Sequence, residues 1–150
     1  IYSALNYAKE NINEWYKLIE NKRKIRLATI HNNISLDHYL NNNKPYLISW
    51  DKSKVDTPIL DLISLYKHHY LEFDFNTIMK IYLNKYPLTK EEMTLFLTMI
   101  SIPNKIEYSN SEYKNVIHIR NIVDYVYKTR DLVAEYSIKD KTDQAQKLQK

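Results

Sequence analysis

Side chains that could do chemistry gather between His31 and Asp51, where two imidazoles alternate with two carboxylates. Asp37 and Asp51 could form an acid pair for hydrolysis, although nothing in the sequence fixes the distance between them. His38 is a possible metal ligand, although imidazole favours softer ions than magnesium, and His31 is a candidate catalytic-loop residue. The alternative is that these are ordinary residues of a loop and hairpin. Elsewhere, His68 and His69 are adjacent on a predicted helix and face different directions, which disfavours a metal pair.

Short extended segments must position these side chains. Residues 26–30, Arg-Leu-Ala-Thr-Ile, are predicted to form a buried strand that delivers the chain to His31. Residues 37–50 are predicted to form a β-hairpin around the turn Asn-Asn-Asn-Lys at 41–44. Asparagine tolerates the left-handed conformation and can replace glycine in such turns. We expect the hairpin to pack against a mainly helical core and to line a site there.

Helices are predicted on both sides of these strands. The first spans residues 1 to about 21, and four more follow the hairpin, beginning at Thr57-Pro58, at Asp74, at the capping box Thr89–Glu92 and near Ser111. Apolar residues at intervals of three and four predict the buried faces. They are Ile1, Leu5, Ala8, Ile12, Trp15 and Ile19; Ile59, Leu62, Ile63 and Tyr66; Phe75, Ile78, Met79 and Tyr82; Met93, Phe96, Leu97 and Ile100; and Val116, Ile119, Val123, Val126 and Val133.

Composition excludes several classes of site. The 150 residues suit one domain. They contain no glycine, so a loop whose backbone amides cradle phosphate is not encoded among them. They contain no cysteine, which excludes disulfides, thiolate zinc sites and a thiol nucleophile. No apolar run reaches the length of a membrane span, so we expect a cytoplasmic protein without a membrane partner. The start at Ile1 suggests a fragment of a longer chain.

The charge balance gives little support to a nucleic-acid interface. The net charge is +4, and the only dense basic cluster comprises residues 22–24 and Arg26. A nucleic-acid-binding helical module would show a basic stripe with interleaved aromatic residues. Cations at the end of a helix are favoured in any case. Nucleic acid is therefore an unlikely partner.

The order helix, strand, His-loop, hairpin, hydrophobic-Trp-Asp and helix resembles the C-terminal lobe of aminoglycoside and choline phosphotransferase-like kinases. It is most similar to the branch of the spore-coat kinase-like proteins, which the segment Pro87–Glu92 also resembles. The family's loop reads His-Gly-Asp, four residues, then Asn; its next strand carries Asp-Trp-Asp or Glu, and an Asp-Leu pair follows. The resemblance covers residues 1–136 and implies a kinase-like C-lobe of α+β class, with 137–150 as a polar tail or exposed helix extension. The family's nucleotide-binding N-terminal lobe would lie outside this chain.

The resemblance also implies which chemistry is missing. His31 matches the loop histidine, but Asn33 falls where the catalytic Asp accepts a proton, and an amide cannot do so. His38 replaces the Asn that holds a metal ion, and Ser49 replaces the Asp that bridges magnesium and the phosphates. Asp51 matches the second acid and is a possible residual metal ligand.

The bracing residue of the Asp-Leu pair is retained as Asp61, which in the family binds backbone amides of the catalytic loop. The resemblance therefore implies a pseudokinase that acts as a binding or scaffold protein with a protein partner, with no cofactor. The alternative is an active small-molecule phosphotransferase in which Asp37 serves as base and Asp51 as metal ligand. Magnesium and ATP would be needed only in that case, together with the N-terminal lobe.

Overall fold

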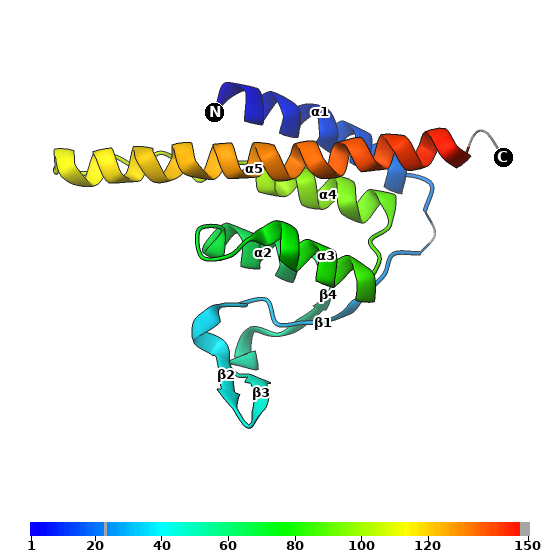
Figure 1. The fold of residues 1–150 in the computed structure, drawn as a ribbon, viewed down its shortest axis with the longest axis horizontal. Coiled ribbons are helices and arrows are strands. Elements are labelled where there is room, and N and C mark those ends of the chain that lie inside the picture. The colour runs from blue at the N-terminus through cyan, green and yellow to red at the C-terminus, as the bar shows by residue number, and fades with distance from the viewer. Residues whose placement is uncertain (23, 148–150) are drawn as a thin grey trace. The chain divides into compact units, whose positions relative to one another are not determined.

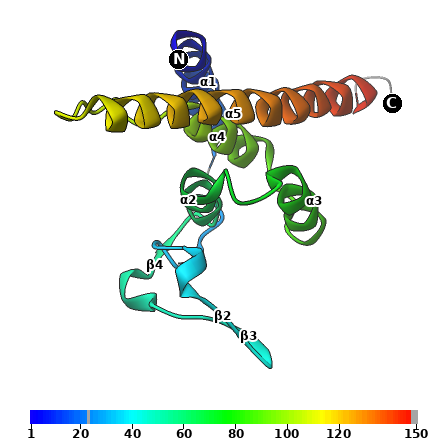
Figure 2. The ribbon, with the colours of Figure 1, turned by 60° about the vertical axis from the view of Figure 1, so that its left-hand side comes forward.

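The computed structural model describes residues 1–22 and 24–147, with the backbone alone from 138 onward. The protein is a mainly helical α+β structure, as predicted, and its chain divides into two compact units (Figures 1 and 2). The loop unit is Tyr16–Pro87, and the helical unit combines Ile1–Trp15 with the chain from Leu88 onward. Within the described residues, no helix is both long and apolar enough to cross a bilayer.

The loop unit contains two small antiparallel sheets. Strands β2 (Tyr39–Asn42) and β3 (Lys44–Leu47) form the predicted hairpin, with Tyr39 opposite Leu47 and Asn42 opposite Lys44. Every hairpin residue except the half-buried Leu47 is exposed. The expectation that the hairpin packs against a helical core is therefore wrong, because neither of its faces is covered.

A second sheet pairs β1 (Ala28–Ile30) with β4 (Lys54–Asp56). The predicted buried strand at 26–30 is wrong in length and in burial, because only its last residue, Ile30, is buried. The other residues lie at the open edge of a two-stranded sheet, where nothing covers their side chains. Strand β1 still delivers the chain to His31, as expected.

Among the described residues, three adopt the left-handed backbone conformation that glycine usually takes. They are Asn32 (φ 57°), Asn43 (φ 58°) and Ser49 (φ 64°). Asn43 joins β2 to β3, which confirms that asparagine serves where glycine is usual. Asn32 and Ser49 lie in the segment that holds the candidate site.

Helices α2 (Ile59–His69) and α3 (Phe75–Lys85) form the core of the loop unit. The predicted face of α2 is confirmed, and the ring of its Tyr66 meets that of Phe75 edge to face at 4.7 Å between centroids. Phe75 and Met79 of α3 are buried, whereas Ile78 and Tyr82 are half-buried. Asp74 caps α3 by accepting a hydrogen bond from the Asn76 amide. A threonine before proline is a typical helix cap, but Thr57 does not cap α2: Pro58 is the N-cap residue with helical angles, and no side-chain hydrogen bond caps this helix.

Helices α1 (Tyr2–Ile19, through Trp15), α4 (Lys90–Ser101) and α5 (Glu112–Lys147) build the helical unit. The predicted capping box is confirmed, since the Thr89 hydroxyl accepts from the Glu92 amide and the Glu92 carboxylate accepts from the Thr89 amide. Helices α4 and α5 pack against each other. Their contact includes the Tyr125 hydroxyl, which donates to the Ile100 carbonyl at 2.5 Å.

The buried face of α5 differs from the prediction. Its buried residues recur at alternating intervals of three and four: Ile122, Tyr125, Thr129, Leu132 and Tyr136. Val116, Ile119 and Val123 are 65%, 47% and 41% exposed, so the valine-rich face is wrong over this stretch. Two apolar stripes run side by side on α5, one residue out of phase. The bulkier stripe is buried because its tyrosines fill more space and one of them hydrogen-bonds to α4.

The face predicted for α1 is also largely wrong. Of its six residues only Ala8 is buried, while Leu5 and Ile12 remain exposed. Tyr7 hydrogen-bonds to Ser137 of α5, which places the contact face of α1 about one residue away from the predicted one. Helix α5 continues through the start of the predicted tail at 137, and residues 148–150 of that tail lie outside the described residues.

Candidate functional site

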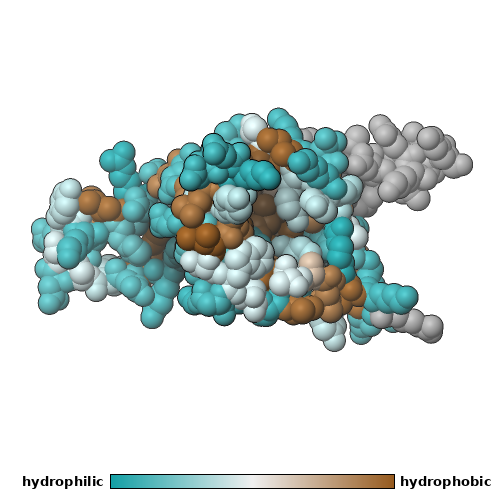
Figure 3. Space-filling model, turned by 90° about the horizontal axis from the view of Figure 1, so that it is seen from below, coloured by the Kyte–Doolittle hydropathy of each residue, from teal (hydrophilic) through white to brown (hydrophobic). Residues whose placement is uncertain are grey.

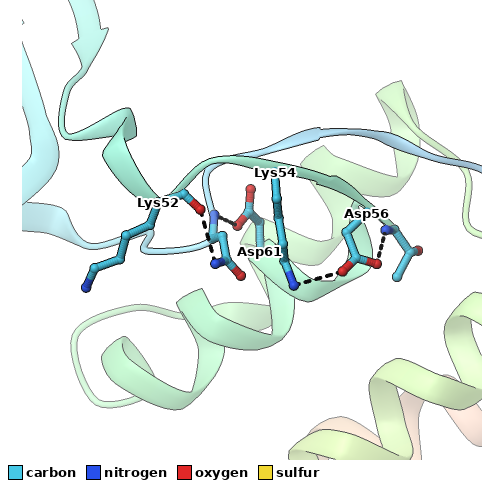
Figure 4. A network of polar contacts seen from close by, with 6 residues as sticks. Lys52, Lys54, Asp56 and Asp61 are labelled. Atoms are coloured by element: carbon cyan, nitrogen blue, oxygen red, sulfur yellow. Dashed lines mark hydrogen bonds and ion pairs between the residues drawn. The ribbon is translucent and has the colours of Figure 1, made fainter.

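The carboxylate of Asp61 holds the turn that follows β1 (Figure 4). One oxygen, Oδ2, accepts a hydrogen bond from the His31 amide at 2.7 Å, and Oδ1 accepts from the Asn32 amide at 2.8 Å. Asp61 lies in the first turn of α2, where the exposed amides of the helix favour negative charge. Asp61 therefore fastens the start of the loop to α2.

Asn32 lets the loop turn without glycine. Its backbone is left-handed, at the position where the family pattern has glycine. Its side-chain amide donates to the Lys52 carbonyl at 3.2 Å, which ties the loop to the short helix η2 (Trp50–Lys52). The same residue therefore supplies both the turn and a crosslink (Figure 4).

His31 is fully buried, with 1% of its surface exposed. Its Nε2–H donates to the Ile48 carbonyl at 2.7 Å, which fixes the proton on Nε2. Nδ1 is buried and has no hydrogen-bond partner within the described part of the chain. The ring lies edge-on to Trp50, with 4.9 Å between centroids. His31 is thus a packed structural residue that joins the loop to the segment after β3.

His38 is held by the loop itself. Its Nδ1–H donates to the Asn33 carbonyl at 2.8 Å, and its ring centroid lies 5.5 Å from that of His31. The Asn33 backbone and the His38 ring are therefore hydrogen-bonded to each other. This bond uses one of the two ring nitrogens that could bind a metal.

Carboxylates are present near the loop but lie in separate turns. Asp37 lies in the short helix η1 (Leu36–His38) and Asp51 in η2, and both are exposed. Ser49 precedes η2 in the left-handed conformation and makes no side-chain cap. In the described ranges, no group of three or more His, Cys, Asp or Glu residues is placed to hold a metal ion.

An ion pair between Lys54 and Asp56 lies between η2 and α2. Lys54 Nζ lies 2.9 Å from Asp56 Oδ2, and Asp56 Oδ1 accepts from the Thr57 amide at 2.8 Å (Figure 4). The hydrogen bond from Lys54, followed by that from Thr57, lowers the pKa of the Asp56 carboxyl. Asp56 is therefore ionised at neutral pH and holds the turn into α2.

The sequence did not reveal the role of His69. This buried residue accepts a hydrogen bond from the Leu36 amide at Nε2 (3.3 Å), while its Nδ1–H donates to Glu72 at 3.0 Å. His69 therefore fastens η1 to the end of α2. Its neighbour His68 is exposed and pairs with Ser64 instead, so the two rings have different surroundings, as their adjacency predicts.

One residue of the predicted basic cluster, Arg26, joins distant parts of the loop unit. The Arg26 guanidinium donates to the Pro87 carbonyl at 3.1 Å, and Lys22 and Lys24 are exposed. Arg23 lies outside the described residues. The contact of Arg26 joins the two ends of the loop unit.

Comparison of the chain with protein-family models, with curated proteins and with solved structures finds no match in any of the three. The candidate site is therefore defined by its own geometry. His31, Asn33, His38 and Asp61 come together with Trp50, while Asp37 and Asp51 are exposed in separate turns. Asn32 could have been found from the sequence, because asparagine tolerates the left-handed conformation in a chain without glycine.

Proposed function

We propose that this chain is the lower lobe of a kinase-like protein that has lost phosphoryl transfer and acts as a binding scaffold. The observation that supports the proposal is the double hydrogen bond from the loop amides to Asp61. It holds the loop at residues 31 and 32, where Asn32 is left-handed and stands at the glycine of the pattern that the sequence resembles. The framework of a catalytic loop is thus built around positions that carry no catalytic carboxylate.

The side chains at those positions cannot perform the reaction that the framework suggests. The amide of Asn33 cannot accept a proton from a substrate hydroxyl at neutral pH. The hydroxyl of Ser49 carries no charge to balance a magnesium ion. His38 already donates one ring nitrogen to a backbone carbonyl. A magnesium-nucleotide would therefore find weak anchorage among these groups.

The surface of the loop unit supports the binding role. Tyr39, Leu40, Tyr46 and Trp50 are 46–55% exposed on and beside the hairpin. Aromatic residues are enriched in protein interfaces, because they offer a large contact area at a low cost in conformational entropy. Brown apolar patches also lie among hydrophilic side chains on the face drawn in Figure 3. A protein partner is therefore part of the proposal.

The test is phosphate transfer and ATP hydrolysis by the intact protein with magnesium or manganese. We expect no turnover above the blank, and no change on Asn33→Ala or Asp51→Ala. The double variant Asn33→Asp with Ser49→Asp is the matched gain-of-function test. Turnover by this variant but not by the parent protein would support the proposal that the missing carboxylates abolish phosphoryl transfer. Turnover by the parent that disappears on Asn33→Ala or Asp51→Ala would overturn the proposal. Loss on Asp37→Ala would favour the rearranged active site instead.

A further inference from the structure

A second site lies wholly within the helical unit, apart from the loop that carries the proposed function. Helices α1, α4 and α5 enclose a cavity of about 200 Å³ that is partly open to the surface. Helix α1 contributes Ala4 and Tyr7, and α4 ends at the cavity with Ser101. Helix α5 supplies Val126, Thr129 and Val133.

The valine stripe of α5 explains why the lining is apolar. Val126 and Val133 belong to the stripe that sequence periodicity predicted to be buried, and both are half-buried against this space. Further toward the start of α5, Val123 on the same stripe is 41% exposed and does not line the cavity. The cavity therefore lies along the part of the valine stripe that α1 covers, where the side chains of α1 leave the space unfilled.

Two of the polar groups at the cavity, those of Ser101 and Tyr7, have hydrogen-bond partners elsewhere. The Ser101 hydroxyl donates to the Leu97 carbonyl at 2.7 Å, within its own helix. The Tyr7 hydroxyl pairs with Ser137 at 3.3 Å, and burial raises the pKa of Tyr7, so this group stays neutral at physiological pH. A ligand gains little from hydrogen bonds to these groups, because each would first have to break an existing one.

Among the described lining residues Arg130 alone is charged, and its exposed guanidinium contacts Tyr127 and Asp131. The group lies 5.0 Å from the centroid of the Tyr127 ring, and Nη2 is 3.5 Å from Asp131 Oδ1. Asp131 offsets the positive charge that would otherwise attract an anion. The side chain of Arg130 therefore borders the cavity without supplying an anion-binding group.

We propose that this cavity is a binding site for compact, uncharged, apolar molecules with a single ring. An apolar cavity of about 150 Å³ in another protein stays dry and binds benzene, so the volume here accommodates one substituted ring. A ligand of seven carbon atoms displaces no ordered polar partner and gains affinity by burying its apolar surface. We expect dissociation constants of about 0.1–1 mM for such a probe.

Toluene and benzoate are the probes, because they have similar shapes and differ in charge. Each is titrated into the protein while carbon–proton NMR spectra of the methyl groups are recorded. We expect saturable shifts for Ala4, Val126 and Val133 with toluene, and at least tenfold weaker binding of benzoate. The absence of saturable shifts up to the solubility limit of toluene would overturn the proposal. Benzoate binding as tightly as toluene would overturn the assignment of an uncharged ligand.

Val126→Phe fills the cavity and is expected to weaken toluene binding at least tenfold. Val123→Phe is the matched control, since it makes the same change on the same stripe outside the cavity and should leave binding within twofold. Ala4→Leu fills the cavity from α1 and provides a second blocking variant if Val126→Phe unfolds. Equal binding by the folded blocking variant and the control would refute the location.

Discussion

Asp61→Ala is the sharpest test of how the loop is held. The change removes both acceptors from the His31 and Asn32 amides. Hydrogen bonds to a charged acceptor contribute about 1.5–3 kcal/mol each. Asn32 is exposed, so its amide can return to water, whereas His31 is buried and its amide would lose its partner. Since Asp61 is itself half-buried and partly screened, we expect a net loss of about 2–3 kcal/mol in the free energy of unfolding.

Tryptophan fluorescence during urea unfolding measures this loss in the loop unit. The chain has two tryptophans, and Trp50 packs against His31. In a Trp15→Phe background the signal comes from Trp50 alone, so unfolding of the helical unit does not contribute. The midpoint should fall without a change in the slope of the transition.

Two further variants define the outcome. Asp61→Asn keeps one acceptor oxygen and should cost about half as much as Asp61→Ala. Asp37→Ala, at an exposed carboxylate in the same segment, should change stability by no more than about 0.5 kcal/mol. If Asp61→Ala cost no more than this control, the bracing role and the argument from the framework would both fail.

Three other perturbations give independent tests. Asn43→Val should destabilise the loop unit by about 1–2 kcal/mol in the same urea assay, because a β-branched residue disfavours φ 58°, whereas Asn43→Gly should be neutral within about 0.5 kcal/mol. Thr89→Ala should cost the helical unit about 1 kcal/mol by circular dichroism, and Thr89→Ser, which keeps the hydroxyl, should cost less than half of that. Hydrogen bonding lowers the pKa of Asp74 from its ordinary value of 3.8, and the bond from the Thr77 hydroxyl is the largest cause. The ionised carboxylate therefore stabilises the loop unit fully above pH 3.8, and this stabilisation is lost as the pH falls through the lower pKa of the folded state. Asp74→Asn should therefore reduce the acid sensitivity of the loop unit below about pH 4, and an unchanged pH profile would contradict this.

Local patterns predicted best where a single apolar stripe decides the packing. Helix α2 has one such stripe, and all four of its predicted residues are buried. Helix α5 has two neighbouring apolar stripes, and the spacing of apolar residues does not decide whether the valine stripe or the tyrosine stripe is buried. The hydrogen bond from Tyr125 to α4, which depends on tertiary structure, separates them. Strand β4 escaped prediction because three residues, Lys54–Asp56, carry no period of their own.

The candidate site could be predicted from the sequence only in part. The two hydrogen bonds that the Asp61 carboxylate accepts from the His31 and Asn32 amides join residues 29 or more positions apart, a contact that no local period in the sequence encodes. His69 could not be predicted, because its partner Leu36 offers a backbone amide, and a backbone amide leaves no mark in the sequence. The packing of Trp50 on His31 also depends on the path of the hairpin between them.

The length of α5 has a consequence for how the helical unit opens. The helix has 36 residues and spans about 54 Å, yet its first buried side chain is Ile122, ten residues after Glu112. The ten residues before Ile122 would be marginal as an isolated helix, but as an extension of a packed helix they need no new nucleus. Once the contacts of Asn115 and His118 with residues 105–109 break, its turns can therefore open from the start of the helix while the packed turns stay closed. Amide protons there should exchange with deuterated solvent long before those around Tyr125, so exchange rates would fall stepwise along one continuous helix.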